Sequence, residues 1–196
     1  MKKLILLIVL ITNFCMFNVS YSEAGNTHTG QDVITAGMPT MGQIKYCINQ
    51  PSASKCPPGN DGKNINSGYI DCSGFSTWVY GQIGIKLSGG TNEQQDKITK
   101  AGCKKTSDWS NIKAGDLAYY PQGASYGHVV IATGNTKPGY IEAIQSSSRK
   151  GTNKAWIPTR SMTGYYSAEC VISHMPKWNS EAYTGTVGSA VLDGTG

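Results

Sequence analysis

The sequence predicts an α+β domain in which N-terminal helices pack on one face of an antiparallel sheet of about five strands. Apolar residues in the first half recur at helical spacing, whereas the second half carries short apolar runs separated by Gly- and Pro-containing turns. Consecutive strands joined by short turns pair antiparallel, so these runs are expected to form one sheet. The sequence shows no internal repeat.

The first 22 residues have the pattern of an export signal. Two lysines precede an unbroken apolar run over residues 4–11, and Ser20 and Ser22 supply the small side chains that a signal peptidase reads. The run is too short for a permanent membrane-spanning helix, and the residues before Cys15 lack the small side chain of a lipoprotein-processing site. We therefore expect an exported protein, periplasmic or secreted, without a stable membrane anchor.

The rest of the chain suits one compact domain, residues 23–178, followed by a Gly-, Thr- and Ser-rich segment, residues 179–196, that is expected to be a flexible tail. The formal net charge is +5, and two positive charges leave with the signal. The remaining lysines are scattered and form no basic stripe with aromatic residues, so nucleic acid is not an expected partner. A weak attraction to an anionic polymer such as cell wall is compatible with this charge.

Residues 69–84 contain a cysteine at the start of an amphipathic helix. Apolar side chains at helical spacing follow Cys72, and Asp71 and Ser73 are residue types that are favoured at helix starts. Unpaired N–H groups and the positive end of the helix dipole lower the pKa of a thiol in that position. Cys72 is therefore predicted to be a nucleophile.

The remaining elements are predicted from the same patterns in chain order. A loosely held segment is expected over residues 23–39, followed by a short helix over residues 40–49 and a long polar loop over residues 50–68. A capping box at residues 91–94 predicts a helix that extends to about Ala101. Strands are expected at residues 117–120, 128–133, 140–145, 154–159 and 165–173.

Five cysteines remain after the signal, and an odd number in an oxidising compartment leaves at least one unpaired. Cys72 is the candidate for the free thiol because of its position at a helix start. Four cysteines allow three connectivities, and we expect Cys47 to pair with Cys56 and Cys103 with Cys170. No cluster has the spacing of zinc ligands, so no metal is expected.

A cysteine nucleophile needs a base, and His128 is the candidate among His28, His128 and His174. His128 opens an apolar strand directly after a glycine, where an imidazole can face a cleft. Such a base is oriented by a polar group at its other ring nitrogen. The next strand offers Glu142 and Gln145, and only the correct strand register brings either of them within reach.

Three motifs in this order resemble the NlpC-type cell-wall peptidases, which are papain-like cysteine enzymes related to the CHAP amidases. The motifs are Asp71-Cys72-Ser73-Gly74 opening the helix, Gly115-Asp116-Leu117 before a strand, and His128-Val129 opening the next strand. The resemblance covers residues 69–148. It implies a papain-like fold and a hydrolase that requires no cofactor.

The resemblance makes Cys72 the nucleophile, His128 the general base and Glu142 the third catalytic residue. The third group in much of the family is His, Asn or Gln, so Glu142 is a departure and Gln145 is its rival. The backbone N–H of Cys72 would form part of the oxyanion hole.

Substrate-binding residues also follow from the resemblance. Asp71 and Ser73 would hold the substrate's free amine or line the site. Family members carry a tyrosine upstream of the cysteine that helps to recognise substrate, and Tyr69 and Tyr46 are the alternatives here. Gln145 completes the expected substrate-binding set.

The implied substrate is a stem peptide of peptidoglycan, cut through a Cys–His thioester mechanism. A γ-D-glutamyl–diaminopimelate endopeptidase is the family's common activity, and an amidase at the sugar–peptide bond is the rival. A non-catalytic cell-wall-binding module would instead have Cys72 locked in a disulfide. An exported antibacterial amidase toxin would have an inhibitor or immunity protein as its partner, and a thiol acyltransferase would resolve the thioester with an amine.

Overall fold

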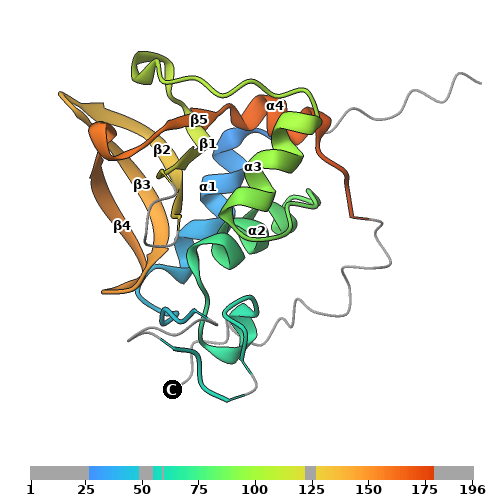
Figure 1. Cartoon of the computed structure of the whole chain (residues 1–196), viewed down its shortest axis with the longest axis vertical. Helices are drawn as coiled ribbons and strands as arrows, with labels where there is room; N and C mark the ends of the chain where they lie inside the picture. Colours follow the sequence, from blue (N-terminus) through green and yellow to red (C-terminus); the bar gives the residue numbers. More distant parts are fainter. Residues whose placement is uncertain (1–26, 49–54, 59, 122–126, 179–196) are drawn as a thin grey trace, which may run out of the picture.

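The structure is a computed structural model that describes residues 27–48, 55–58, 60–121 and 127–178 of the 196-residue chain. The export signal and the C-terminal tail expected from the sequence lie outside these residues. Figure 1 shows an α+β domain with the strands, yellow to orange, on one side and the helices packed against them. Every helix in the described ranges is too short or too polar to cross a bilayer.

One sheet of five strands forms the β half of the domain, in the order β4-β3-β2-β1-β5. Every neighbouring pair is antiparallel, which confirms the predicted sheet. Tight turns join β2 to β3 and β3 to β4, so these strands pair with their chain neighbours, whereas β5 returns to pair with β1. The strands are β1 (Ala114–Tyr119), β2 (Val129–Lys137), β3 (Tyr140–Ser147), β4 (Gly151–Pro158) and β5 (Gly164–Tyr166).

Apolar residues of the sheet enter two separate clusters, one on each face, because alternate residues of β1, β2, β3 and β5 point to opposite faces. Strand β4 contributes apolar residues only to the smaller cluster. The larger cluster joins the sheet to the helices, and the smaller one lies on the opposite face around Ala118, Val130 and Ile157. In the larger cluster, helix residues Val33, Phe75, Val79, Ile98, Val171 and Ile172 pack with strand residues Leu117, Tyr119, Val129, Ile131 and Ile144.

The described residues form four α-helices on one side of the sheet: α1 (Gly30–Gly37), α2 (Cys72–Gln82), α3 (Thr91–Lys100) and α4 (Ala168–His174). Helix α2 confirms the helix predicted after Asp71, and α3 confirms the one predicted from Thr91. The predicted capping box does not open α3, because its N-cap is Gly90 and no side chain caps it.

The N-terminal prediction was wrong in two places. The segment expected to be loosely held contains α1, which Thr29 and Asp32 begin with a reciprocal capping box and which buries Val33 and Ile34. The helix expected over residues 40–49 is replaced by a short 3-10 turn, Met38–Thr40, and an extended stretch.

The extended stretch has a local cause. Gly42 has a φ of 77°, a left-handed conformation that ends a helical path. Lys45 then hydrogen bonds along the chain on both sides of Tyr69, donating to Gly68 O at 2.9 Å and accepting from Ile70 N at 2.9 Å.

The last predicted strand, residues 165–173, is also corrected. Strand β5 ends at Tyr166, and the chain then turns into α4. The Asp116 carboxylate accepts a hydrogen bond from Ala168 N at 2.8 Å, so it satisfies an N–H group at the helix start that no cap side chain reaches. The apolar run is therefore helical, with Val171 and Ile172 buried.

Both expected disulfides are present. Cys47 is bonded to Cys56, and Cys103, which follows α3, is bonded to Cys170 in α4. Cys72 is the free cysteine of the described residues, which confirms the expected free thiol, and its side chain is buried.

Candidate active site

The free thiol lies at the first residue of α2. Asp71 is the N-cap, and its Oδ1 accepts a hydrogen bond from Gly74 N at 2.6 Å. This bond fixes the first turn of the helix, so that Cys72 is held at its start with 5% of its surface exposed.

The sulfur of Cys72 lies against the backbone on both sides of His128. Its Sγ is 4.0 Å from the carbonyl oxygen of Gly127, and it accepts a hydrogen bond from the backbone N–H of Val129. The fold therefore brings the predicted nucleophile from α2 to the residue predicted to be its base, at the beginning of β2.

The imidazole of His128 is held by Gln145 of β3, with Nε2 and Oε1 2.6 Å apart. An amide oxygen can only accept, so Nε2 carries the proton and the lone pair of the neutral ring lies on Nδ1. Asn153 Oδ1 accepts from Gln145 Nε2 at 3.2 Å, which fixes the orientation of the amide. The ring of Tyr120 meets the imidazole edge-on, with centroids 5.3 Å apart.

The structure corrects the choice between Glu142 and Gln145. The two residues are an odd number of positions apart on β3, so they point to opposite faces of the sheet. Ile131 of β2 pairs with Ile144, and continuing this register puts His128 on the Gln145 face, diagonal to it. Gln145, expected as a substrate-binding residue and as the rival of Glu142, therefore contacts the imidazole.

Glu142 instead belongs to a polar cluster at another part of the sheet. Its carboxylate accepts hydrogen bonds from Thr133 Oγ1 at 2.9 Å and Asn135 Nδ2 at 2.8 Å, and it lies 3.0 Å from Lys154 Nζ. Burial alone would raise the pKa of Glu142, but the bonds from Asn135, Lys154 and Thr133 outweigh it and lower the pKa. These contacts hold the Glu142 carboxylate on the face of the sheet opposite Gln145.

The electrostatics of the thiol differ from the expectation for a helix start. Burial, followed by the charge of Asp71, raises the pKa of Cys72 to about 11. The Val129 N–H, the Lys63 charge and the Ser73 N–H act in the opposite direction and are smaller effects. Desolvation of the charged thiolate thus outweighs the helix start.

Burial also lowers the pKa of His128, against the opposing effects of Gln145 and Asp71. With the pKa of the thiol raised and that of the imidazole lowered, both groups are neutral near pH 7. This arrangement suits an imidazole that removes the thiol proton as attack begins, rather than a preformed thiolate–imidazolium pair.

The other expected substrate-binding residues differ in their surroundings. Asp71 and Ser73 both contact Lys63, a residue that the sequence analysis did not select. Tyr69 lies beside the Lys45 ammonium, 5.8 Å from ring centroid to Nζ. Burial raises the pKa of Tyr46, as do the nearby Cys72 and Asp71, so Tyr46 lies in the electrostatic surroundings of the thiol.

Gln94 supports the site from α3 and was not anticipated. It is fully buried, its Nε2 donates to Ser73 O at 2.9 Å, and its Oε1 accepts from Tyr119 OH at 3.2 Å. Its side chain thus joins α2, which carries Cys72, to β1. Gln94, which the sequence pattern placed in a capping box, is therefore buried and links α2 to β1 through hydrogen bonds.

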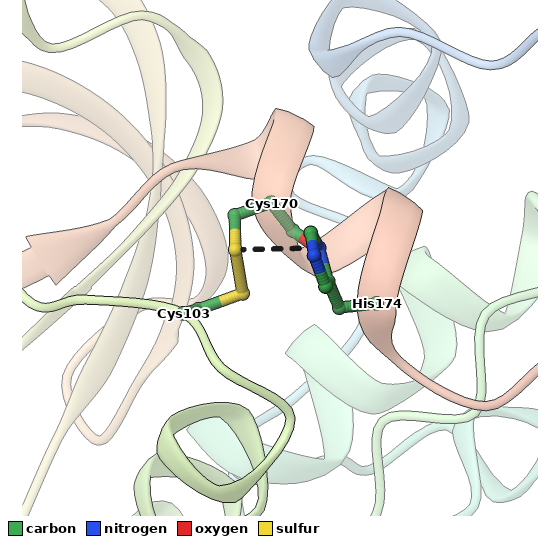
Figure 2. Close-up of side chains that lie close together, drawn as sticks. All are labelled: Cys103, Cys170 and His174. Carbon is green, nitrogen blue, oxygen red and sulfur yellow. Dashed lines mark hydrogen bonds between the residues drawn. A yellow bond between two sulfur atoms is a disulfide. The ribbon is translucent and has the colours of Figure 1, made fainter.

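The described residues contain one group of side chains that could be considered for a metal: Cys103, Cys170 and His174 (Figure 2). His174 Nδ1 is 3.6 Å from Cys170 Sγ. Both sulfurs are bonded to each other, however, and zinc requires thiolates. In this oxidised form the group is a disulfide with a neighbouring imidazole.

A free thiol at a helix start, against the backbone on both sides of a histidine whose imidazole is held by an amide, is an arrangement that suits a thiol hydrolase. Residues 59–174 match the model of the NlpC/P60 family. The chain belongs to the NlpC/P60 family.

Two relatives carry enzyme names. The chain is 36% identical over 65 residues to endopeptidase p60 of Listeria grayi, covering 33% of this chain and 12% of the relative. It is 27% identical over 112 residues to the peptidoglycan DL-endopeptidase CwlO of Bacillus licheniformis, covering 57% of this chain and 22% of the relative. The match thus spans less than a quarter of either relative.

Similar solved structures include an NLP/P60-family protein of Staphylococcus aureus, with 18% identity, a TM-score of 0.47, and coverage of 71% of this chain and 41% of that one. NlpC1 of Trichomonas vaginalis has 15% identity and a TM-score of 0.48, with coverage of 71% and 44%.

Proposed function

We propose that this protein is a peptidoglycan hydrolase that cleaves an amide bond of the stem peptide, with Cys72 as nucleophile, His128 as general base and Gln145 as the residue that orients the base. The observation that carries the proposal is the position of the free Cys72 sulfur against the backbone on both sides of His128. Family membership, together with the names of the two relatives, supports the substrate class.

The proposed reaction starts from a neutral thiol and a neutral imidazole. His128 Nδ1 takes the proton from Cys72 Sγ as the sulfur attacks the amide carbonyl, and the backbone N–H of Cys72 at the helix start donates to the developing oxyanion. The imidazolium then protonates the leaving amine, which breaks the C–N bond and leaves a thioester. Water, deprotonated by His128, hydrolyses the thioester and restores the thiol.

Gln145 acts in each step by holding the proton on His128 Nε2. Its oxygen favours the tautomer whose lone pair is on Nδ1, and it continues to accept from Nε2 when the ring becomes positively charged. Asn153 supports this role because it holds the amide in that orientation. The proposed chemistry uses only side chains and backbone groups of the protein and water.

For the bond that is cut, we infer the γ-D-glutamyl–diaminopimelate linkage, supported by the DL-endopeptidase name of one relative. Export to the periplasm or beyond is supported by the signal pattern and by two disulfides, which form in oxidising compartments. An immunity protein remains a prediction from the sequence. A non-catalytic wall-binding module is less well supported, because Cys72 is not tied to another cysteine.

The test is digestion of purified peptidoglycan by the exported form of the protein, followed by mass spectrometry of the soluble fragments. Cleavage after γ-D-glutamate leaves dipeptides on the sugar and releases fragments that begin with diaminopimelate. An amidase would release complete stem peptides and leave bare glycan. Binding to peptidoglycan without any new fragment would contradict the proposal and favour the wall-binding module.

A further inference from the structure

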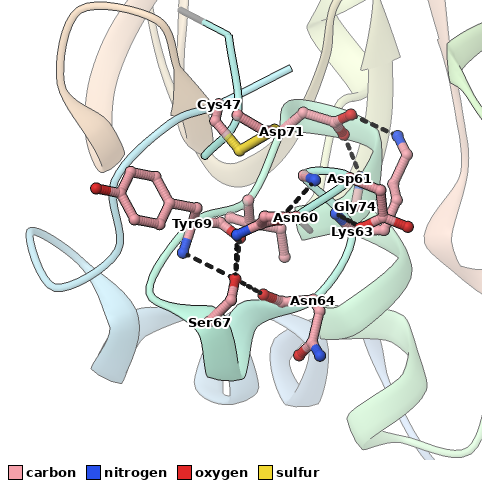
Figure 3. The surroundings of a disulfide bond; sticks show 12 residues. Cys47, Asn60, Asp61, Lys63, Asn64, Ser67, Tyr69, Asp71 and Gly74 are labelled. Atoms are coloured by element: carbon pink, nitrogen blue, oxygen red, sulfur yellow. Dashed lines mark hydrogen bonds and ion pairs between the residues drawn. A yellow bond between two sulfur atoms is a disulfide. The ribbon is translucent and has the colours of Figure 1, made fainter. Parts of the chain in front are cut away.

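Lys63 occupies the flank of the candidate nucleophile. Its Nζ is 2.5 Å from Asp71 Oδ2 (Figure 3) and 2.5 Å from Ser73 Oγ. Asp71 and Ser73 are the chain neighbours of Cys72. The carboxylate and the hydroxyl thus form an acceptor pair that binds one ammonium group. In this structure the ammonium group comes from the protein itself.

The remaining acceptor atom of Asp71 is also occupied. Asp71 Oδ1 accepts hydrogen bonds from Gly74 N at 2.6 Å and from Ser73 Oγ at 2.8 Å. The Asp71 side chain is 6% exposed, whereas that of Lys63 is 38% exposed. An amine of a substrate could therefore reach the carboxylate only by displacing Lys63.

The loop that carries Lys63 is held in place by its own contacts. Asp61 Oδ1 accepts from Lys63 N at 2.9 Å, and Asn60 Oδ1 accepts from Gly62 N at 2.8 Å. Gly62 O accepts from Asp71 N at 2.7 Å, which joins the loop directly to the residue before the nucleophile. Figure 3 shows Asn60, Asp61, Lys63 and Asp71 of this region beside the disulfide of Cys47.

The position of Gly62 ties the same loop to the disulfide. Gly62 has a φ of 74°, and a Cβ on it would lie 2.6 Å from Cys47 O and 3.3 Å from Cys56 Sγ. The loop backbone is therefore packed tightly on the disulfide, and a larger residue would push Lys63 away from Asp71. The loop thus contacts both the disulfide and Asp71, so the three parts are held in one fixed geometry.

An ammonium group on the same chain has an advantage over one that arrives from solution. Tethering through a short segment gives an effective concentration in the millimolar range, about 1 mM or more. The contacts of the loop raise this advantage, because they preorganise the segment before substrate binds. A substrate amine present below this effective concentration does not displace Lys63 from Asp71 and Ser73.

We propose that Lys63 is a specificity-determining residue: its ammonium group fills the Asp71–Ser73 acceptor pair beside Cys72, so the protein accepts stem peptides whose amino end is blocked. This inference rests on the proposed function. In intact peptidoglycan the amino end of the stem peptide is joined to the sugar by an amide bond and carries no charge. The protein therefore gains nothing from a free amino end, and the glycan-attached stem peptide is accepted as readily as the free peptide.

The experiment compares two stem peptides of the same sequence, one with a free amino end and one with an acetylated end. For the wild-type protein the two values of kcat/KM should agree within about threefold. Lys63→Met should create a preference for the free amine of about tenfold, the effect of one charge-assisted hydrogen bond. Lys63→Arg keeps a cation on the loop and should leave the two peptides nearly equal.

Lys154→Met is the matched control. Lys154 also pairs with a largely buried carboxylate, Glu142, at 3.0 Å, but that pair does not contact the residues beside Cys72. In this control variant the ratio of kcat/KM for the two peptides should be the same as in the wild-type protein. Should Lys63→Met fail to fold, the ratio of the two kcat/KM values of the wild-type protein decides, together with the effect of alaninamide at about 0.1 mM, roughly a tenth of the effective concentration above. Alaninamide should not inhibit hydrolysis of the acetylated peptide.

The outcomes separate this inference from the proposed function. A wild-type preference of more than about tenfold for the free amine, or strong inhibition by alaninamide, would overturn the role of Lys63 and leave the hydrolase proposal intact. Hydrolysis of neither peptide and of no purified peptidoglycan would overturn both.

Discussion

His128, the residue just before β2, is hydrogen bonded to Gln145 of β3, with Nε2 and Oε1 2.6 Å apart. This contact decides the protonation of the ring, because the amide oxygen accepts and the lone pair is left on Nδ1. The residue that the resemblance favoured, Glu142, points to the other face of the same strand. The orienting group is therefore an uncharged amide. Burial lowers the pKa of the imidazole and outweighs the opposing effects of Gln145 and of the Asp71 charge.

The role of Gln145 can be tested with Gln145→Leu, which removes the acceptor and keeps a side chain of similar size. We expect kcat/KM to fall by about tenfold to a hundredfold, because the ring loses its preferred tautomer and orientation. Hydrolysis of an acetylated stem peptide measures the change, and thermal unfolding checks that the variant is folded. Wild-type activity in a folded Gln145→Leu protein would remove this residue from the mechanism.

Glu142→Gln should affect stability rather than catalysis. The amide keeps much of the hydrogen bonding with Thr133 and Asn135 but loses the charge opposite Lys154, which costs about 1 kcal/mol of unfolding free energy. The hydrogen bonds lower the pKa of Glu142, so its contribution is present above the unfolded pKa and is lost as the pH falls. Urea unfolding at pH 7 and pH 3 measures this. A loss of activity equal to that of Gln145→Leu would instead restore Glu142 as the orienting residue.

The thiol should titrate at high pH. Burial and the Asp71 charge raise the pKa of Cys72 to about 11, so little thiolate is present at pH 7. The rate of alkylation of the wild-type protein by iodoacetamide should therefore rise with pH through the range above 9. Cys72→Ala, in which the remaining described cysteines are paired, is the control for other reactions. A midpoint below pH 7 would mean that the helix start outweighs burial.

The acid limb of the activity profile should report His128. Burial lowers the pKa of this imidazole from its ordinary value of 6.5. The base is active when neutral, so kcat/KM should be retained at pH 6.5 and should fall only as the pH drops through the lowered pKa. A profile of kcat/KM between pH 4 and pH 8 gives the midpoint, and a midpoint above 6.5 would indicate a charged partner that the structure does not place beside the ring.

The two disulfides should contribute unequally to stability. The Cys103–Cys170 bond closes 67 positions and the Cys47–Cys56 bond closes 9. On the chain-entropy model, replacement of the long-range pair by serines costs about 4 kcal/mol and of the short-range pair about 2.6 kcal/mol. Denaturant unfolding of the two double variants measures the difference. Equal losses would mean that the short loop is stabilised chiefly through its contacts with residues 60–71.

Local sequence patterns predicted the parts of the fold that depend on neighbouring residues. The helix after Asp71 has an N-cap residue and an apolar face within one short stretch, and strands β1 to β3 have Gly or Pro turns beside them. The strand predicted over residues 165–173 was wrong after Tyr166, because α4 begins there and its Ala168 N–H donates to Asp116, which lies 52 positions earlier. An apolar run alone does not distinguish a short helix from a strand.

Local patterns also predicted part of the candidate site, but not the residues that depend on tertiary contacts. Cys72 and His128 could be found from their position at the starts of two elements. The choice between Gln145 and Glu142 needed the strand register, which a sequence does not give. Lys63 could not be found, because it lies in a polar turn without periodicity and reaches Asp71 only through the folded loop. The contacts of Gln145 and Lys63 are tertiary, so no pattern of neighbouring residues in the sequence predicts them.

The central claim is that the Cys72 sulfur performs the hydrolysis. The most direct measurement compares wild-type and Cys72→Ala proteins on the same purified peptidoglycan, with mass spectrometry of the released fragments and thermal unfolding of both proteins. The account predicts new stem-peptide fragments from the wild-type protein and none from a folded Cys72→Ala protein. Release of the same fragments by Cys72→Ala would contradict it.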